Sequence, residues 1–206
     1  MAKMKLYYSP ASPYARKVRV VAIETKLDKK IEMVNVALTP VAPNADVDKH
    51  NPIGKIPALS VKGIDLFDSP VICEYLDNQH KGRKLFPRKG RDRWVALRQQ
   101  AMADGLLDAA LLTRYENALR PEDKRWQEWT QGQTKKIKGV LAQLEAEAKS
   151  LKGKLTIGTI AVVCALGYLD LRFADLGWRN EHPKLAKWLA QTSKLPSIRA
   201  TVPPAA

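Results

Sequence analysis

The sequence predicts an α/β unit followed by an all-helical unit, and three observations carry this prediction. Short β-prone segments alternate with helical patterns over the first 80 residues. From residue 94 onward, apolar residues recur only at helical spacing. Between these regions lies a basic stretch, residues 81–93, whose two glycines and one proline are typical of a linker. We therefore predict domains at 1–80 and 94–206 joined by this linker, which suits a chain of 206 residues.

The first unit begins with a β-α-β pattern. Residues 6–8 form a β-prone run that ends at Pro10, because proline is rarely tolerated inside a strand. A helix is predicted from Pro13, since Tyr14, Val18 and Val21 are spaced for one helical face. Residues 31–36 then alternate apolar and polar side chains, which indicates a half-buried strand.

A hairpin and a second helix complete the first unit. Residues 58–61 and 64–67 flank Lys62-Gly63, a pair that favours a two-residue hairpin turn. Ser69 before Pro70 marks a helix start, as an N-cap followed by a proline in the first turn. A parallel β-α-β unit followed by an antiparallel hairpin predicts a mixed four-stranded sheet covered by helices.

The second unit shows four helical patterns and no strand-like alternation. These patterns cover residues 91–118, 122–150, 159–174 and 184–192, and the third is much more apolar than the others. We expect the five tryptophans to anchor helix packing rather than to form a ligand cage: Trp94, Trp126, Trp129, Trp178 and Trp188.

The excess positive charge is concentrated in the linker. The chain carries 35 basic and 21 acidic side chains, a net charge of +14, and residues 81–93 contribute seven basic residues against one acidic. We interpret this stretch as a solvated hinge, because runs of like charge are usually solvated. A patch for nucleic acid or another acidic partner is the alternative.

The cysteine and histidine content excludes several kinds of site. Two cysteines, Cys73 and Cys164, are too few for a disulfide framework or a cysteine-rich zinc site, and both lie in apolar helical stretches that predict buried thiols. Three scattered histidines make a histidine-based metal centre improbable, so we expect no metal. The N-terminal residues show no apolar segment of a secretory signal, and no apolar run is long enough to span a membrane. We expect a reduced, cytoplasmic protein without membrane attachment.

Three motifs in this order and spacing resemble the glutathione S-transferase superfamily, namely residues 7–16, 51–59 and 67–72. The resemblance covers nearly the whole chain, and residues 103–108 and 159–169 are similar to a bacterial subfamily. It implies a thioredoxin-like N-terminal domain followed by an all-helical C-terminal bundle. It also implies a cytoplasmic homodimer that uses glutathione as co-substrate.

Ser12 stands where thioredoxin-like redox proteins carry the first cysteine of a Cys-X-X-Cys motif. Because both cysteines are absent, dithiol exchange is not available, and the motif resembles that of serine-type transferases. Ser12 before Pro13 would cap a helix, so a hydroxyl donor and a positive helix end would face a thiol held there. The alternatives are a plain N-cap, the competing hydroxyl of Ser9, and, more weakly, Tyr8.

The other two motifs resemble the glutathione-binding segments of the family. Ile56-Pro57 resembles the cis-proline loop, whose backbone pairs with an extended peptide as an added strand. Asp68-Ser69 resembles the acid-serine pair that holds the γ-glutamyl group, and Lys55 would attract the glycyl carboxylate. The alternative for Pro57 is an ordinary proline at the start of a strand, and for Asp68-Ser69 it is N-capping alone. For Lys55 the alternative is a solvated side chain.

The helical unit supplies further candidates by resemblance. Asp104 and Asp108 lie four residues apart on one helix face. The resemblance implies that an acid on this helix reaches the ammonium group of glutathione bound to the partner subunit. The alternative is that both aspartates lie on a solvated face near Arg98 or Arg114. Possible lining residues of a second-substrate pocket are Tyr14, Leu106 and Leu107. The family's core helix opens with Ser/Thr-X-X-Asp. Here Thr159 is followed by Val162, so we expect the reciprocal capping bond to be lost.

The leading hypothesis is a glutathione transferase of a detoxification type, whose glutathione thiolate attacks a small hydrophobic electrophile. One alternative is a non-catalytic transferase-like module for binding or assembly, motivated by the +14 charge. Another is a glutathione-dependent peroxide or disulfide reductase, against which serine rather than cysteine at position 12 argues.

Overall fold

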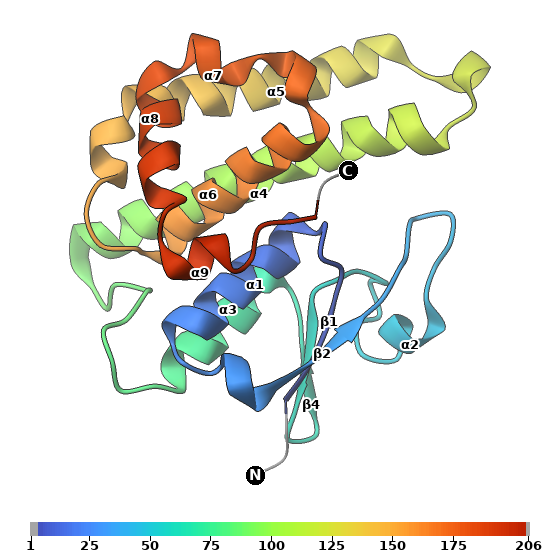
Figure 1. Ribbon diagram of the computed structural model, residues 1–206. Helices are drawn as coiled ribbons and strands as arrows, with labels where there is room; N and C mark the ends of the chain where they lie inside the picture. The colour runs from blue at the N-terminus through green and yellow to red at the C-terminus, as the bar shows by residue number, and fades with distance from the viewer. Residues whose placement is uncertain (1–3, 205–206) are drawn as a thin grey trace. The chain divides into compact units, whose positions relative to one another are not determined.

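The computed structural model describes residues 4–204, which form two compact units. The first comprises residues 4–93 together with 196–204, and the second comprises residues 94–195. The first unit contains the sheet and the second is built from helices (Figure 1).

A mixed four-stranded sheet forms the centre of the first unit, as predicted. Its strands follow the order β2-β1-β3-β4, with bounds β1 (Met4–Tyr8), β2 (Ile31–Asn35), β3 (Ala58–Val61) and β4 (Ile64–Leu66). β1 pairs in parallel with β2 and antiparallel with β3, which in turn pairs antiparallel with β4. The hairpin turn has positive φ at both Lys62 (48°) and Gly63 (80°), the conformation that a type I′ turn requires.

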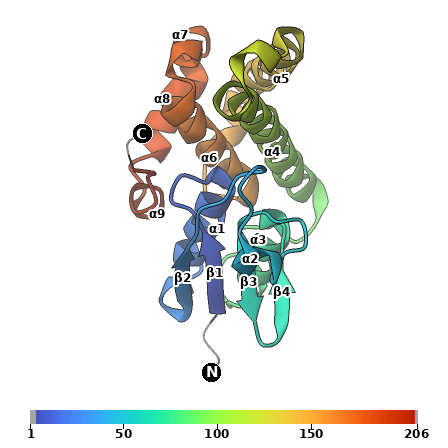
Figure 2. The same cartoon turned by 90° about the vertical axis from the view of Figure 1, so that its right-hand side faces the viewer.

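Helices cover both faces of this sheet. α1 (Pro13–Glu24) and α3 (Ser69–Asn78) lie side by side on one face, and the short α2 (Ala45–Asp48) lies on the other (Figure 2). Successive strand residues point to opposite faces, so Leu6 is buried on the first face. Tyr7 packs with Val47 of α2 and Ala58 of β3 on the second face.

The second unit is helical throughout its described length. Its main helices are α4 (Gly90–Leu119), which starts within the first unit, α5 (Gln127–Ala146), α6 (Ile157–Arg172), α7 (Trp178–Glu181) and α8 (Pro183–Thr192). Every residue of α6 from Ile157 to Leu166 is buried, so this apolar helix is the core of the unit. Short 3₁₀ turns η2 (Glu122–Lys124), η3 (Ala148–Leu151) and η4 (Ala174–Leu176) connect these helices, and η1 (Asp28–Lys30) precedes β2.

The C-terminal segment differs from the sequence-based boundary, which grouped it with the helical domain 94–206. Residues 196–204, with α9 (Pro196–Arg199), belong to the first unit and pack on α1. Two α1 guanidinium groups hold it: Arg16 Nη2 donates to the Ile198 carbonyl at 3.3 Å, and Arg19 Nη2 donates to the Ala200 carbonyl at 3.5 Å. Side-chain bonds to a distant backbone leave no periodic signal in the sequence.

The linker 81–93 has exposed charges but a fixed backbone. The buried carboxylate of Asp77 accepts the N–H groups of Leu85 at 2.9 Å and Phe86 at 3.0 Å, and both apolar side chains are buried. Lys84 Nζ donates to the His80 carbonyl at 2.6 Å, near the end of α3. The stretch is therefore anchored to the first unit, and its last four residues already belong to α4.

Two helix starts differ from the predicted ones. α6 begins one turn earlier, where Thr156 is the N-cap and exchanges reciprocal capping bonds with Thr159. The expected loss of this capping box was wrong, because a threonine hydroxyl accepts the reciprocal bond that an aspartate would take. Asp68 rather than Ser69 caps α3, its carboxylate accepting the Ser69 N–H.

The buried-residue predictions were confirmed in part. Both cysteines are free and buried, as expected. Trp178 and Trp188 are buried and donate to Asp170 and to the Leu151 carbonyl, but the expectation of packing anchors was wrong for Trp94 and Trp126, which are largely exposed.

Within residues 4–204 no individual helix combines the length and apolar character that crossing a membrane requires. Only Ile157–Arg172 and Ala174–Glu181 taken together meet these criteria, and the two are bent by 101°.

Gly158 sets the close approach of α6 to α4. An added Cβ would lie 2.5 Å from the Ala96 carbonyl oxygen and 2.7 Å from Gln99 Oε1. We therefore expect Gly158→Ala to lower the free energy of unfolding by about 1–3 kcal/mol in urea titrations.

Gly139 is the matched control, because a methyl group there meets nothing within 4 Å. Gly139→Ala should raise the stability by about 0.5–1 kcal/mol through helix propensity. Equal stability of the two variants would contradict the close approach.

Candidate functional site

The start of α1 places a serine hydroxyl beside a helix N-terminus. Ser12 is the N-cap: its Oγ accepts the Ala15 N–H at 3.2 Å, and its carbonyl accepts the Arg16 N–H at 2.9 Å. Because the Ser12 oxygen serves as acceptor, the hydroxyl proton remains able to donate to a ligand. The first turn of α1 contains no acidic residue, so the positive helix end is not neutralised from within the helix.

Two basic residues of α1 are buried next to this first turn. Arg16 is 5% and Lys17 is 1% exposed, and both lie in the second turn of α1. Ser9, the competing hydroxyl, lies in the same turn as Ser12 and accepts the Ser12 N–H through its carbonyl at 3.0 Å. Its side chain makes no hydrogen bond within residues 4–204. A thiolate bound at this corner would meet a donor hydroxyl and the positive end of α1.

The loop before β3 presents an unpaired backbone edge. The Ile56–Pro57 bond is cis, as the sequence resemblance implied. Within the described part of the chain, neither the N–H nor the C=O of Ile56 has a hydrogen-bond partner. Buried Asn51 fixes the loop, because its Nδ2 donates to the Lys55 carbonyl at 2.8 Å and its Oδ1 accepts the Ile53 N–H at 3.0 Å. An extended peptide can therefore pair with a preorganised edge.

The start of α3 supplies polar groups of both kinds. Ser69 is fully buried, and its Oγ has no hydrogen-bond partner in the described structure. Asp68 is exposed and presents a carboxylate beside it. An unpartnered buried hydroxyl is rare, and a polar ligand group would satisfy it, so this pair fits an amino-acid head group. Lys55 is exposed and its ammonium group makes no ion pair within residues 4–204.

Three hydrogen-bonded side chains, which the sequence analysis did not predict, support this loop. The hydroxyl of Tyr7 lies 2.8 Å from His50 Nε2, and His50 Nδ1 lies 2.9 Å from Asp65 Oδ1. The Tyr7 and His50 rings are also stacked, with centroids 4.5 Å apart. This Tyr7–His50–Asp65 chain of hydrogen bonds connects β1 and β4 to the segment after α2, which leads into the Ile56 loop. Sequence separations of 43 and 15 residues leave no local signal for it.

The family is decided by the domain models that match the chain. A model described as the N-terminal domain of glutathione S-transferase matches residues 11–79, and one described as its C-terminal domain matches residues 127–191. The chain belongs to the glutathione S-transferase family. The uncharacterized GST-like protein YibF of Escherichia coli K12 is 31% identical over 98% of this chain and 100% of its own length.

Solved structures of relatives agree with this assignment. A glutathione transferase family member from Pseudomonas fluorescens Pf-5, with bound glutathione, is 48% identical with a TM-score of 0.97. A second structure from that organism, with bound S-(propanoic acid)-glutathione, is also 48% identical and has a TM-score of 0.92. Both matches cover 98% of this chain and 100% of the other.

The candidate residues of the helical unit lie on α4, apart from Tyr14. Asp104 is half-buried and Asp108 exposed, whereas Leu106 and Leu107 are buried. Arg98, considered as a neighbour of the aspartates, forms an ion pair with Glu147 instead. Tyr14 is half-buried on α1 of the first unit.

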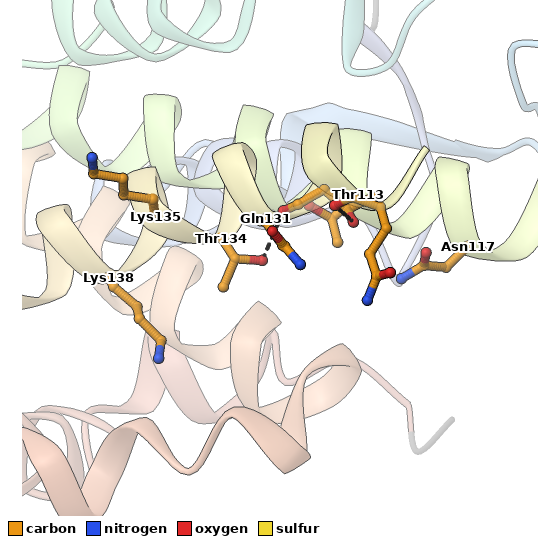
Figure 3. Close-up of a pocket in the computed structure, with 8 residues that line it drawn as sticks. Thr113, Asn117, Gln131, Thr134, Lys135 and Lys138 are labelled. Atoms are coloured by element: carbon orange, nitrogen blue, oxygen red, sulfur yellow. Dashed lines mark hydrogen bonds between the residues drawn. The ribbon is translucent and has the colours of Figure 1, made fainter. Parts of the chain in front are cut away.

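A separate pocket of about 430 Å³ lies between α4 and α5 in the second unit (Figure 3). None of the predicted site residues lines it. Its threonine hydroxyls are engaged by their own helices, as when Thr134 Oγ1 donates to the Thr130 carbonyl at 2.9 Å. The lining is polar or basic throughout: Thr113, Asn117, Gln127, Thr130, Gln131, Thr134, Lys135 and Lys138. No three His, Cys, Asp or Glu side chains among residues 4–204 form a metal-binding group.

The Tyr7–His50–Asp65 chain generates a stability prediction. Replacing His50 by alanine leaves the Tyr7 hydroxyl and the Asp65 carboxylate without their shared partner. The free energy of unfolding should fall by about 1–3 kcal/mol, with a smaller loss in His50→Gln, which retains one hydrogen bond. Lys49→Ala, in an exposed pair with Asp46, is the control and should leave stability nearly unchanged. If His50→Ala matched that control, the chain would not stabilise the loop.

Proposed function

We propose that this family member is an active glutathione transferase that binds glutathione in the first unit and ionises its thiol at Ser12. The observation that carries the proposal is the hydroxyl of Ser12 at the N-terminus of α1, with its oxygen occupied by Ala15 and its proton able to donate. Support comes from the relative at 48% identity, which matches 98% of this chain and whose structure contains bound glutathione.

Glutathione is a short extended peptide, and the first unit offers a group for each of its parts. The cysteinyl backbone would pair with the free N–H and C=O of Ile56 beside Pro57. Asp68 would bind the α-ammonium of the γ-glutamyl residue, and Ser69 would bind its carboxylate. Lys55 would attract the glycyl carboxylate. Asp104 of a partner subunit in a homodimer would add a second anion for the ammonium.

Thiol ionisation is energetically within reach of this site. A free thiol has a pKa of about 8.5, so about 3% is thiolate at pH 7. Lowering that pKa by about two units requires about 2.7 kcal/mol of preferential stabilisation of the anion. One hydrogen bond to a charged group supplies about 1.5–3 kcal/mol, and a helix end adds about 0.3–1 kcal/mol. Ser12 and the start of α1 could therefore together supply the stabilisation of the thiolate that this pKa shift requires. Ser9 is the alternative hydrogen-bond donor.

The thiolate would attack an electrophilic carbon of a small hydrophobic second substrate. The sulfur–carbon bond forms as the leaving group departs with its bonding electron pair. Residues expected to contact that substrate are Tyr14, Leu106 and Leu107. The relative's complex with S-(propanoic acid)-glutathione supports a site that accepts a substituent on sulfur. We place this activity in the cytoplasm, in a detoxification role.

Ser12→Ala tests the proposed activation. Losing one charge-assisted hydrogen bond should lower kcat/KM about 10- to 100-fold with a chlorinated nitrobenzene at pH 7. Glutathione affinity, measured by calorimetry, should change less than about threefold, because the hydroxyl acts mainly on the ionised sulfur.

Two further variants separate catalysis from folding, because Ser12→Ala also removes an N-cap at a cost of about 0.5–2 kcal/mol. Ser12→Thr keeps both the cap and the hydroxyl and should retain activity. Ser9→Ala should remain close to wild type. A loss of activity in Ser9→Ala with none in Ser12→Ala would assign thiol activation to Ser9 instead.

A further inference from the structure

One histidine bridges three strands of the sheet on the face that α2 covers. The register pairs Tyr7 of β1 with Ala58 of β3, and it pairs Ser60 of β3 with Asp65 of β4. Residues that pair across strands, and residues two apart along a strand, project from the same face. Tyr7 and Asp65 therefore lie on one face, on either side of β3. Because the imidazole of His50 is hydrogen-bonded to both, it spans the central strand between them.

Both ring nitrogens of His50 are engaged. A carboxylate only accepts hydrogen bonds, so Nδ1 of His50 donates to Asp65 across 2.9 Å. In the neutral imidazole Nε2 is then the acceptor, and the Tyr7 hydroxyl donates to it across 2.8 Å. The ring of Tyr7, which is 9% exposed, also stacks on the imidazole. Two bonds and one ring contact therefore fix the orientation of the His50 side chain.

His50 attaches the segment between α2 and β3 to the sheet. Asn51 holds this segment from within, because its Nδ2 donates to the Lys55 carbonyl and its own carbonyl accepts the Gly54 N–H at 2.8 Å. Among the hydrogen bonds of the described range 4–204, those of His50 are the ones that join residues 49–56 to the strands. Asn51 therefore fixes the shape of the loop, whereas His50 fixes its position on the sheet.

The two proposed peptide-binding segments meet at one end of the hairpin. β3 begins directly after Pro57, and β4 ends two residues before Asp68. Because β3 and β4 run antiparallel, the start of β3 and the end of β4 lie at the same end. Asp65, the β4 partner of His50, belongs to the strand that leads to this end. The Tyr7–His50–Asp65 chain therefore holds the loop that presents Ile56 against the strand that leads to Asp68.

We propose that His50 is a positioning residue for the peptide substrate, which sets the affinity for glutathione by holding the backbone edge at Ile56 in place beside Asp68 and Ser69. This inference rests on the proposed function. An extended peptide must engage both segments at once, and a loop free to move relative to the hairpin would have to be ordered when the peptide binds. Thiol ionisation is assigned to Ser12 on α1, a different element, and does not depend on His50.

Calorimetry of glutathione binding to the whole chain is the main test. His50→Ala should raise the Kd for glutathione about tenfold, because the loosened loop must be ordered on binding. His50→Gln, which keeps one hydrogen bond, should show a smaller rise. With saturating glutathione and a chlorinated nitrobenzene, kcat of His50→Ala should stay within about twofold of wild type, so that the loss appears in KM for glutathione.

Gly158→Ala separates positioning from a general loss of stability, because it is expected to lower the free energy of unfolding by a similar amount from within the second unit. It should keep the wild-type Kd, as should Lys49→Ala, which breaks an exposed ion pair beside His50. Tyr7→Phe should raise the Kd less than His50→Ala, and adding it to His50→Ala should raise the Kd no further. An unaltered Kd in His50→Ala, or an equal rise in Gly158→Ala, would overturn the proposal.

Hydrogen exchange in the ligand-free chain distinguishes this inference from the proposed activity. The amides of Ile53 and Gly54, which donate to Asn51, should exchange about tenfold faster in His50→Ala and at the wild-type rate in Lys49→Ala. Unaltered exchange in His50→Ala would overturn the positioning role even in an active transferase. Glutathione binding without turnover in wild type would contradict the proposed activity alone, and the Kd comparison would still decide the role of His50. Absence of glutathione binding to wild type would overturn both.

Discussion

The hydrogen bond from the Ala15 N–H to the Ser12 hydroxyl oxygen is the interaction on which the candidate site depends. Pro13 occupies the first helical position, where its missing N–H costs no helical hydrogen bond, and Ser12 before it caps the helix. This use of the oxygen orients the hydroxyl and leaves its proton as the donor. The same geometry places the hydroxyl at the positive end of α1, so that one local motif would provide both contributions to the proposed stabilisation of the thiolate.

In the proposed function, the rest of the first unit would hold a peptide beside that corner. The sheet sets β3 antiparallel to β1, and Asn51 fixes the loop that ends at Pro57. The Tyr7–His50–Asp65 chain ties the segment before this loop to the sheet. Because these contacts lie within the first unit itself, they fix the backbone edge at Ile56, and the proposed peptide would bind there with little reordering.

Local patterns were enough to predict most elements and the positions of the three site motifs. Proline at 13, the Lys62-Gly63 turn and the alternation over 31–36 each act within a few residues, and the structure confirmed them. The capping of α6 was mispredicted because a threonine can replace the usual acid, a substitution that alters no periodicity.

Long-range side-chain bonds account for what the sequence did not reveal. The return of residues 196–204 to α1 depends on guanidinium contacts of Arg16 with a carbonyl 182 positions away. The fixed course of the linker depends on the single buried carboxylate of Asp77.

The ionisation state of the sulfur of bound glutathione tests the central claim most directly. Thiolate absorbs in the ultraviolet, so a pH titration of the glutathione complex measures the thiol pKa in place. The account predicts an apparent pKa about two units below the ordinary value of about 8.5. An ordinary pKa for saturably bound glutathione would contradict it, because the start of α1 would then not stabilise the anion.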